Sequence, residues 1–310
     1  MKRNQLHKVL FFLGFILCAS SFIPAPAALV GGFLFTLFFG HPFPDLSHKA
    51  TSLLLKVSVV GLGFGMNATA AFKAGKDGFL LTLASLVLIL VLGYLVGRWL
   101  KIPTKLSHLV ACGTAICGGS AIAAVAPVVN ANEKEVSMSL GVVFLLNSIA
   151  LILFPFMGHF LGLTEYNFGL WSAIAIHDTS SVVGAASAYG EEALMVATTV
   201  KLARALWIIP ISFLSVFLFK GKGKKTVIPW FILLFVATML FNSYYPMGIN
   251  ATFFKISKSL LVATLFLIGS SLSITSIKEV GLKPLVLGVI LWGIISVLSL
   301  VAIVGWVDLH

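Results

Sequence analysis

Five ionisable residues lie within apolar stretches of the sequence, where charged side chains are otherwise rare. They are Lys56, His177, Asp178, Lys201 and Arg204. Inside a lipid bilayer each of them costs about 2.5 to 3.5 kcal/mol on insertion scales unless it faces a cavity or a partner. Three are permanent cations and one is a carboxylate, which leaves two positive charges unpaired. A surplus of that sign favours a binding site for an anion.

Lys201 and Arg204 are three residues apart and therefore share one face of a helix. Arginine suits a tetrahedral oxyanion because its planar donors pair with two oxygens at once. The alternative is a structural ion pair between Asp178 and one of these cations, with Lys56 extending its amine toward the membrane surface. We favour the anion site, because two predicted helix breaks accompany the charges.

The two predicted breaks lie in segments of small and polar residues. Residues 111–127, ACGTAICGGSAIAAVAP, carry Gly118 and Gly119 in the middle, where a helix is weakest. Residues 173–188, AIAIHDTSSVVGAASA, place the polar string HDTSS at the middle of an apolar span. In the alternative reading, the small residues serve only the close packing of helices.

Residue types that cap helix N-termini follow both breaks, namely Ser120 in the first and Asp178, Thr179 and Ser180 in the second. A helix that restarts inside the membrane presents free N–H groups and the positive end of its dipole, and both favour an anion. The predicted substrate-binding residues are therefore Gly118, Gly119, Ser120, His177, Asp178, Thr179, Ser180, Lys201 and Arg204.

Asp178 and His177 are also candidates for binding a coupling ion, H⁺ or Na⁺. Asn67, Asn147 and Ser273 are candidate polar helpers for that ion. In the alternative, Asp178 only neutralises the two cations while the site is empty and yields them to the substrate when it arrives.

The composition places these residues in a membrane protein. Of the 310 residues, 59% are hydrophobic and 10% are charged, whereas a soluble domain carries about 25% charged residues. A membrane-crossing helix takes about 20 residues, so eleven of them leave no room for a separate soluble domain. We predict an all-α polytopic membrane protein in which residues 1–310 form a single transporter domain.

About eleven apolar spans are separated by charged residues or by Pro, Gly and Asn. With the N-terminus inside, thirteen Lys and Arg residues lie in inside segments and five in outside segments. Because basic residues stay on the cytoplasmic side during insertion, the N-terminus is predicted to be cytoplasmic and the C-terminus outside. The net charge of +11 then reflects contact with anionic lipid, and no nucleic acid is predicted as a partner. The spans are residues 9–24, 26–39, 50–71, 79–97, 107–129, 137–161, 167–188, 194–219, 227–244, 257–276 and 284–305.

The third and tenth spans echo one another at an offset of 206 residues. By their order these two spans run in opposite directions, so the echo indicates an inverted repeat, which is typical of secondary transporters. The matched residues are Gly63, Thr69 and Gly75 with Gly269, Thr275 and Gly281.

Five strings spread along nearly the whole chain, in order, carry a resemblance to a known family. They are CGGSAIAAVAPVVNANEKE, IHDTSSVVGAASAYG, KLARALWIIP, PWFILLF and GLKPL. They resemble the YeiH-type inner-membrane proteins, a family named for sulfate export within the cation/proton antiporter and anion transporter superfamily. The resemblance implies inverted repeats, crossed and interrupted helices and a place in the bacterial inner membrane. It also implies that Gly118–Ser120 and His177–Ser180 lie near a substrate.

We therefore expect a secondary transporter, and more specifically an exporter, of a small oxyanion such as sulfate or an organosulfonate. The first alternative is an anion channel. The second is an intramembrane hydrolase using Ser120 and His177, although the local string GGSA lacks the usual second glycine and no third group orients the histidine. An aspartyl protease would need two carboxylates, and only Asp178 lies at membrane depth.

No enzyme activity, cofactor or metal is predicted. Cys112 and Cys117 are five residues apart, which is not a metal-ligand spacing, and Cys18 stands alone. The expected partners are a small anion, the lipid bilayer and H⁺ or Na⁺, with a second copy in a homodimer as the one protein partner considered.

Overall fold

The computed structural model describes residues 2–20, 23, 25–219, 230–271 and 281–307, and in this part of the chain every regular element is helical. Five stretches are long and apolar enough to cross a membrane, and several shorter helices are also apolar. Apart from residues 50–71, each predicted span overlaps, where it is described, with one helix or with a pair of helices. The long stretches are Ala68–Trp99, Lys134–Phe160, Glu191–Phe219, Gly248–Ser271 and Leu282–Gly305.

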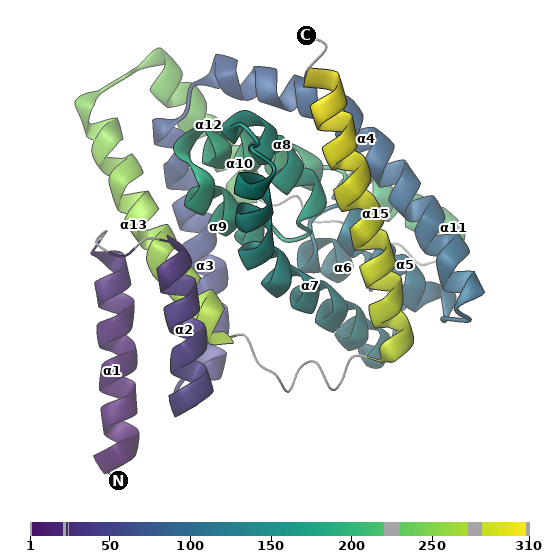
Figure 1. The fold of residues 1–310 in the computed structure, drawn as a ribbon, viewed down its shortest axis with the longest axis horizontal. Helices are drawn as coiled ribbons and strands as arrows, with labels where there is room; N and C mark the ends of the chain where they lie inside the picture. The colour runs from purple at the N-terminus through teal and green to yellow at the C-terminus, as the bar shows by residue number, and fades with distance from the viewer. Residues whose placement is uncertain (1, 21–22, 24, 220–229, 272–280, 308–310) are drawn as a thin grey trace. The chain divides into compact units, whose positions relative to one another are not determined.

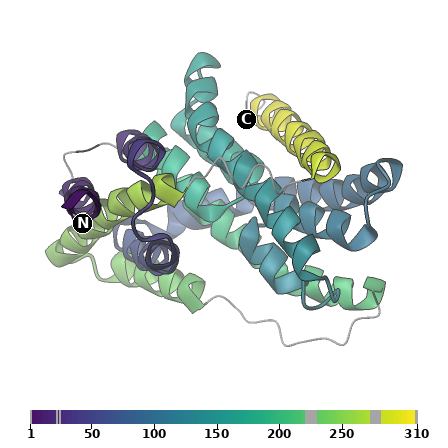
Figure 2. The ribbon, with the colours of Figure 1, turned by 90° about the horizontal axis from the view of Figure 1, so that it is seen from below.

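The chain divides into two compact units, one formed by residues 1–71 and 229–273 and the other by residues 72–228 and 274–310. In the first unit, α13 packs against α1, α2 and α3, and α12 packs against α3 and η1. Figures 1 and 2 both show α13 beside α2. The elements of this unit are α1 (Lys2–Ala19), α2 (Ala25–Phe39), α3 (Pro44–Leu62), η1 (Gly63–Gly65), α12 (Trp230–Tyr244) and α13 (Gly248–Ser271).

Gly32 lets α2 approach the backbone of α13 closely. A Cβ atom at Gly32 would lie 2.1 Å from the carbonyl oxygen of Phe266, whereas one at the neighbouring Gly31 would meet nothing within 4 Å. We expect Gly32→Ala to lower the free energy of unfolding by about 1 to 3 kcal/mol, because backbone must move to relieve the overlap. Gly31→Ala should leave it unchanged or raise it by up to about 1 kcal/mol, because this glycine is exposed and alanine favours a helix interior. The thermal unfolding midpoints of the two variants in detergent check this, and equal midpoints would contradict it.

The second unit contains both predicted helix breaks and the basic pair. Here α8 packs against α10 and α15, and α7 packs against α5 and α9. Figures 1 and 2 show α15 running beside α5. The elements are α4 (Ala68–Trp99), α5 (Thr104–Ala115), α6 (Gly119–Val125), α7 (Glu133–Phe160), α8 (Glu165–Ala175), α9 (Thr179–Tyr189), α10 (Glu191–Ala205), α11 (Ile208–Phe219) and α15 (Leu282–Val307).

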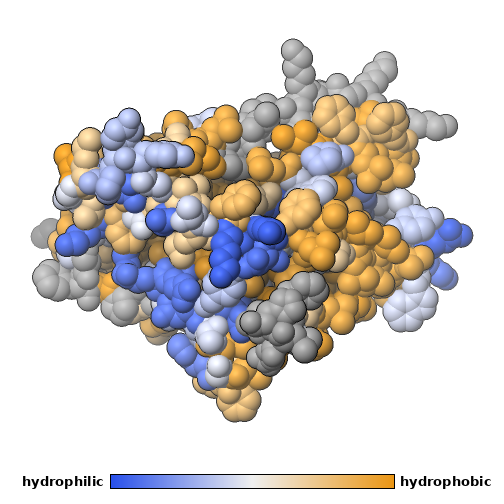
Figure 3. Space-filling view, turned by 90° about the horizontal axis from the view of Figure 1, so that it is seen from above, coloured by the Kyte–Doolittle hydropathy of each residue, from blue (hydrophilic) through white to orange (hydrophobic). Residues whose placement is uncertain are grey.

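Buried aromatic side chains fix α8 in the second unit. Trp171 stacks on Phe154 of α7 with ring centroids 4.3 Å apart, and its indole N–H donates to the Ser296 carbonyl of α15 at 2.9 Å. Outside this core, large apolar side chains are exposed, and Phe160 and Phe217 each keep 81% of their surface. Figure 3 shows extended apolar areas beside a hydrophilic one on the face that it draws. Surfaces of this kind are expected on helices that face lipid.

Two predicted boundaries were wrong. The span 50–71 was too long, because α3 ends at Leu62 and α4 begins at Ala68, where the Asn67 side chain accepts hydrogen bonds from the N–H groups of Thr69 and Ala70. The span 194–219 contains an unpredicted turn between α10 and α11. Pro210 lies one turn further on and has no N–H to donate to the carbonyl of Leu206.

Candidate functional site

The two predicted helix breaks exist and lie against each other. The first separates α5, which ends at Ala115, from α6, which begins at Gly119; the second separates α8, which ends at Ala175, from α9, which begins at Thr179. Gly118 has φ +65°, and a Cβ atom there would lie 3.3 Å from the Cα of Asp178. Four helix ends therefore meet in the interior of the second unit.

The predicted N-caps are correct for one break and wrong for the other. Asp178 caps α9, because its carboxylate accepts a hydrogen bond from the N–H of Ser180 at 3.0 Å. Ser120 does not cap α6: the capping position is Gly118, which has no side chain to do so. Ser120 lies within α6 and is exposed. The left-handed backbone at Gly118 decides where α6 begins, and this is a conformation that serine rarely adopts.

Lys201 and Arg204 extend from α10 to the C-terminal ends of both interrupted helices. The Lys201 amine donates to the carbonyls of Ala173 and Ile176 at 3.3 and 2.7 Å. Arg204 donates from Nη1 to the carbonyl of Ile174 at 3.0 Å and from Nε to that of Ala115 at 2.6 Å. Both cations have 0% exposure. They satisfy carbonyls that have no partner within their own helices and neutralise the negative dipole ends.

The structural ion pair that was considered as the alternative, between Asp178 and one of these two cations, is not formed. In the described ranges, the hydrogen bonds of Lys201 and Arg204 go to main-chain carbonyls. The Asp178 carboxylate instead accepts from the N–H and hydroxyl of Ser180. Asp178 is thus held by its own helix, and the two cations are held by the ends of the neighbouring ones.

Of the three predicted polar helpers, Asn147 reaches the site. Its Oδ1 atom accepts hydrogen bonds from the N–H groups of His177 and Asp178, each at 3.1 Å, so α7 fixes the second break. Asn67 is in the first unit and caps α4. Ser273 lies outside the described residues.

Several buried polar atoms around the breaks have no hydrogen-bond partner. They are Nη2 of Arg204, Nδ2 of Asn147 and both ring nitrogens of His177. Leaving one buried polar group unsatisfied costs about 1 to 3 kcal/mol, and more when the group is charged. Unsatisfied polar atoms of this kind come from three neighbouring segments. They favour a binding site in which a polar ligand supplies the missing hydrogen-bond partners.

The site holds fewer unpaired positive charges than the two that were counted from the sequence. That count included Lys56, which lies in α3 of the first unit. Around the breaks there remain two cations and one carboxylate. Each helix end adds about half a unit charge, positive at the N-terminus and negative at the C-terminus, so the two ends of each kind cancel. The site therefore carries one uncompensated positive charge.

The residues proposed for a hydrolase do not form a dyad here. Both ring nitrogens of His177 are without a partner, so neither is bonded to the hydroxyl of Ser120. The cysteines 18, 112 and 117 are free and buried, and Cys112 contacts the His108 ring nitrogen at 3.4 Å. Among the described residues, no three His, Cys, Asp or Glu side chains are grouped so that they could hold a metal ion.

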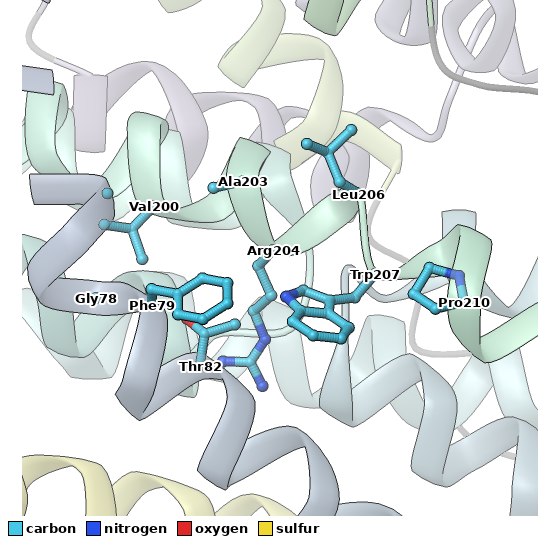
Figure 4. A pocket seen from close by; sticks show the side chains of 10 residues that line it. Gly78, Phe79, Thr82, Val200, Ala203, Arg204, Leu206, Trp207 and Pro210 are labelled. Carbon is cyan, nitrogen blue, oxygen red and sulfur yellow. The ribbon is translucent and has the colours of Figure 1, made fainter. Parts of the chain in front are cut away.

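A pocket of about 330 Å³ adjoins Arg204 between α4 and the turn from α10 to α11. Figure 4 shows the Arg204 side chain beside those of Phe79, Thr82 and Trp207. None of these three neighbours was predicted from the sequence. They lie on segments more than a hundred residues apart, and the one available signal was Pro210, which follows the bend beside the pocket.

Comparisons with known proteins identify relatives along nearly the whole chain. The sequence model of the family described as Conserved hypothetical protein 698 matches residues 14–288. A UPF0324 membrane protein of Bacteroides thetaiotaomicron is 50% identical over 285 residues, covering 91% of this chain and 86% of that protein. One of Photobacterium profundum is 50% identical over 301 residues, covering 96% and 92%. One of Shewanella oneidensis is 48% identical over 296 residues, covering 95% and 94%. No solved structure matches the chain.

Proposed function

The chain belongs to the UPF0324 family of bacterial membrane proteins, and we propose that it transports a small oxyanion, such as sulfate or an organosulfonate, across the membrane. One observation carries the proposal. Arg204 is completely buried where two interrupted helices meet, and its Nη2 atom still has no partner. A buried guanidinium with an unused donor is a costly arrangement that an anion would relieve.

Each residue around the breaks has a role in this mechanism. Arg204 and Lys201 attract the anion by charge, and the Nη2 donor of Arg204 is free to bond one of its oxygens. Asp178 keeps α9 capped through Ser180 while the anion comes and goes. The carbonyls that hold Lys201 and Arg204 in place keep the two cations at the site when it is empty.

The membrane potential favours export. Moving one charge through 100 mV is worth about 2.3 kcal/mol, so a dianion leaving a negative interior gains about 4.6 kcal/mol. This energy supports a concentration ratio of about a thousandfold or somewhat more. Export of such an anion needs no coupling ion, whereas uptake of a dianion would be aided by the potential only with at least three accompanying monovalent cations.

The test is anion flux in vesicles that contain the purified protein. We expect labelled sulfate, or one anion of a set including sulfite, thiosulfate, sulfoacetate and small carboxylates, to leave the vesicles faster when their interior is made negative. Exchange of internal labelled for external unlabelled anion should saturate, as for a carrier. Flux far above carrier turnover without such exchange would indicate a channel. No protein-dependent flux of any of these anions would refute the proposal.

A further inference from the structure

The pocket beside Arg204 is mostly apolar. Its walls include Phe79 of α4, Val200 of α10, and Leu206, Trp207 and Pro210 of the turn and α11. The rings of Phe79 and Trp207 lie 6.1 Å apart, centroid to centroid, and tilted by 36°. They form a continuous aromatic wall.

Among the described residues that line this pocket, Arg204 carries a charge and Thr82 a hydroxyl, and Trp207 adds an indole N–H. Arg204 contributes a guanidinium whose Nη2 atom has no partner, and Thr82 is 3% exposed. Figure 4 shows these two side chains close to each other. The pocket thus offers donors for one small anionic group, surrounded by hydrocarbon.

Such a lining does not suit an inorganic ion alone. Sites for small organic molecules have volumes of about 300 to 1,000 Å³ and are mainly apolar with a few placed polar groups, and a volume of about 330 Å³ falls in that range. A bare sulfate would leave most of the wall without contacts. It would also lose its hydrating water in a pocket that has few hydrogen-bond donors to replace that water. An apolar body joined to the anion would fill the remaining space.

Arg204 is the charged side chain among the described residues that line the pocket, and the wider charge balance around the helix breaks also favours a single negative charge in the occupant. Lys201 and Arg204 against Asp178 leave about one positive charge once the helix ends cancel. A monoanion neutralises the site, whereas a dianion reverses its sign. A sulfonate or a carboxylate on an organic body meets this requirement.

We propose that the transported substrate is an organic monoanion with a short hydrocarbon or aromatic body. Its charged head binds Arg204 and Thr82, and its body lies against Phe79 and Trp207. This inference rests on the proposed transport function and narrows its substrate class from small oxyanions in general to anions that carry an apolar group.

Gly75 offers a way to fill the pocket without touching Arg204. It lines the pocket, and a Cβ atom there would meet nothing within 4 Å. Gly75→Leu places a hydrocarbon side chain where the substrate body would lie. The matched control is Gly293→Leu on α15, because a Cβ atom at that exposed glycine also meets nothing within 4 Å.

Binding of three probes to the full-length protein in phosphatidylcholine nanodiscs tests the proposal. Benzenesulfonate carries both features, inorganic sulfate lacks the apolar body, and benzenesulfonamide lacks the charge. We expect benzenesulfonate to bind about tenfold tighter than either of the others, because the buried ring adds to the ionic contact. Gly75→Leu should weaken benzenesulfonate about tenfold more than it weakens sulfate, since only the ring competes with the leucine. Gly293→Leu should change neither affinity.

The outcomes separate this inference from the proposed function. If sulfate binds and benzenesulfonate binds no tighter, or if Gly75→Leu affects both equally, the organic substrate is wrong and oxyanion transport survives. If no anion binds, transport itself is refuted. Anionic lipid offers the same chemistry, so the titration is repeated with phosphatidylglycerol in the nanodiscs. Unchanged benzenesulfonate affinity supports a soluble substrate, whereas competition by the lipid assigns the pocket to the membrane and overturns the proposal.

Discussion

Arg204→Ala is expected to reduce anion flux at least about thirtyfold, because truncating a buried, hydrogen-bonded charge typically costs about 2 to 5 kcal/mol or more. The variant removes the donors to Ala115 and Ile174 together with the free Nη2 atom. Flux in vesicles measures the effect, normalised to the amount of folded protein incorporated. Unchanged flux from folded Arg204→Ala would end the assignment of this residue to the anion site.

Two further variants separate a loss of function from a loss of folding. Arg204→Lys keeps the charge, but a single amine cannot reproduce the planar donors that reach both helix ends, so we expect intermediate flux. Arg98→Ala is the matched control, because Arg98 is exposed and, among the described residues, its guanidinium donates to the Tyr94 hydroxyl at 3.3 Å. It should transport like the wild type. If Arg98→Ala loses as much flux as Arg204→Ala, the effect is general and not specific to the site.

Gly118→Ala is expected to lower the free energy of unfolding by about 2 to 6 kcal/mol, since backbone strain and close contact each cost about 1 to 3 kcal/mol. Gly118 has φ +65° and ψ −127°, and its new Cβ atom would lie 3.3 Å from the Cα and Cβ atoms of Asp178. The substitution therefore pushes the two breaks apart, and flux should fall with stability. Thermal unfolding in detergent and vesicle flux measure the two effects.

The neighbouring Gly119→Ala provides the comparison. Its Cβ atom would meet the ring of Phe144 at 3.1 Å, an exposed side chain that can shift, and it would stand at the first residue of α6 in a helical position. We expect a change within about 1 kcal/mol, because alanine also favours the helix by a similar amount. Equal destabilisation by both substitutions would show that crowding, and not the backbone conformation of Gly118, limits the first break.

Much of the architecture could be predicted from local patterns. Runs of apolar residues predicted the helices, because a helix needs about 20 such residues to cross a bilayer and the length of a run can be read directly from the sequence. One glycine pair and several helix-capping residues predicted the two breaks for an equally local reason. The i, i+3 spacing predicted that Lys201 and Arg204 would act at one place, and both reach the end of α8.

The errors came from features without a local pattern. The N-cap assigned to Ser120 was wrong because the positive φ of Gly118 moved the start of α6. The bend between α10 and α11 was missed although Pro210 signals it, because apolar residues continue on both sides. The wall formed by Phe79 and Trp207 joins residues far apart in the chain.

The sequence alone determined that this is a helical membrane protein with buried cations and two interrupted segments, because charge, length and helix-breaking residues are properties of short stretches. Only the tertiary structure decided what the cations bind. Their partners are the carbonyls of Ala115, Ala173, Ile174 and Ile176, and every residue type carries the same carbonyl. A main-chain carbonyl therefore cannot be identified as an acceptor from the sequence. It becomes a specific partner only where a helix ends and that end packs against a cation.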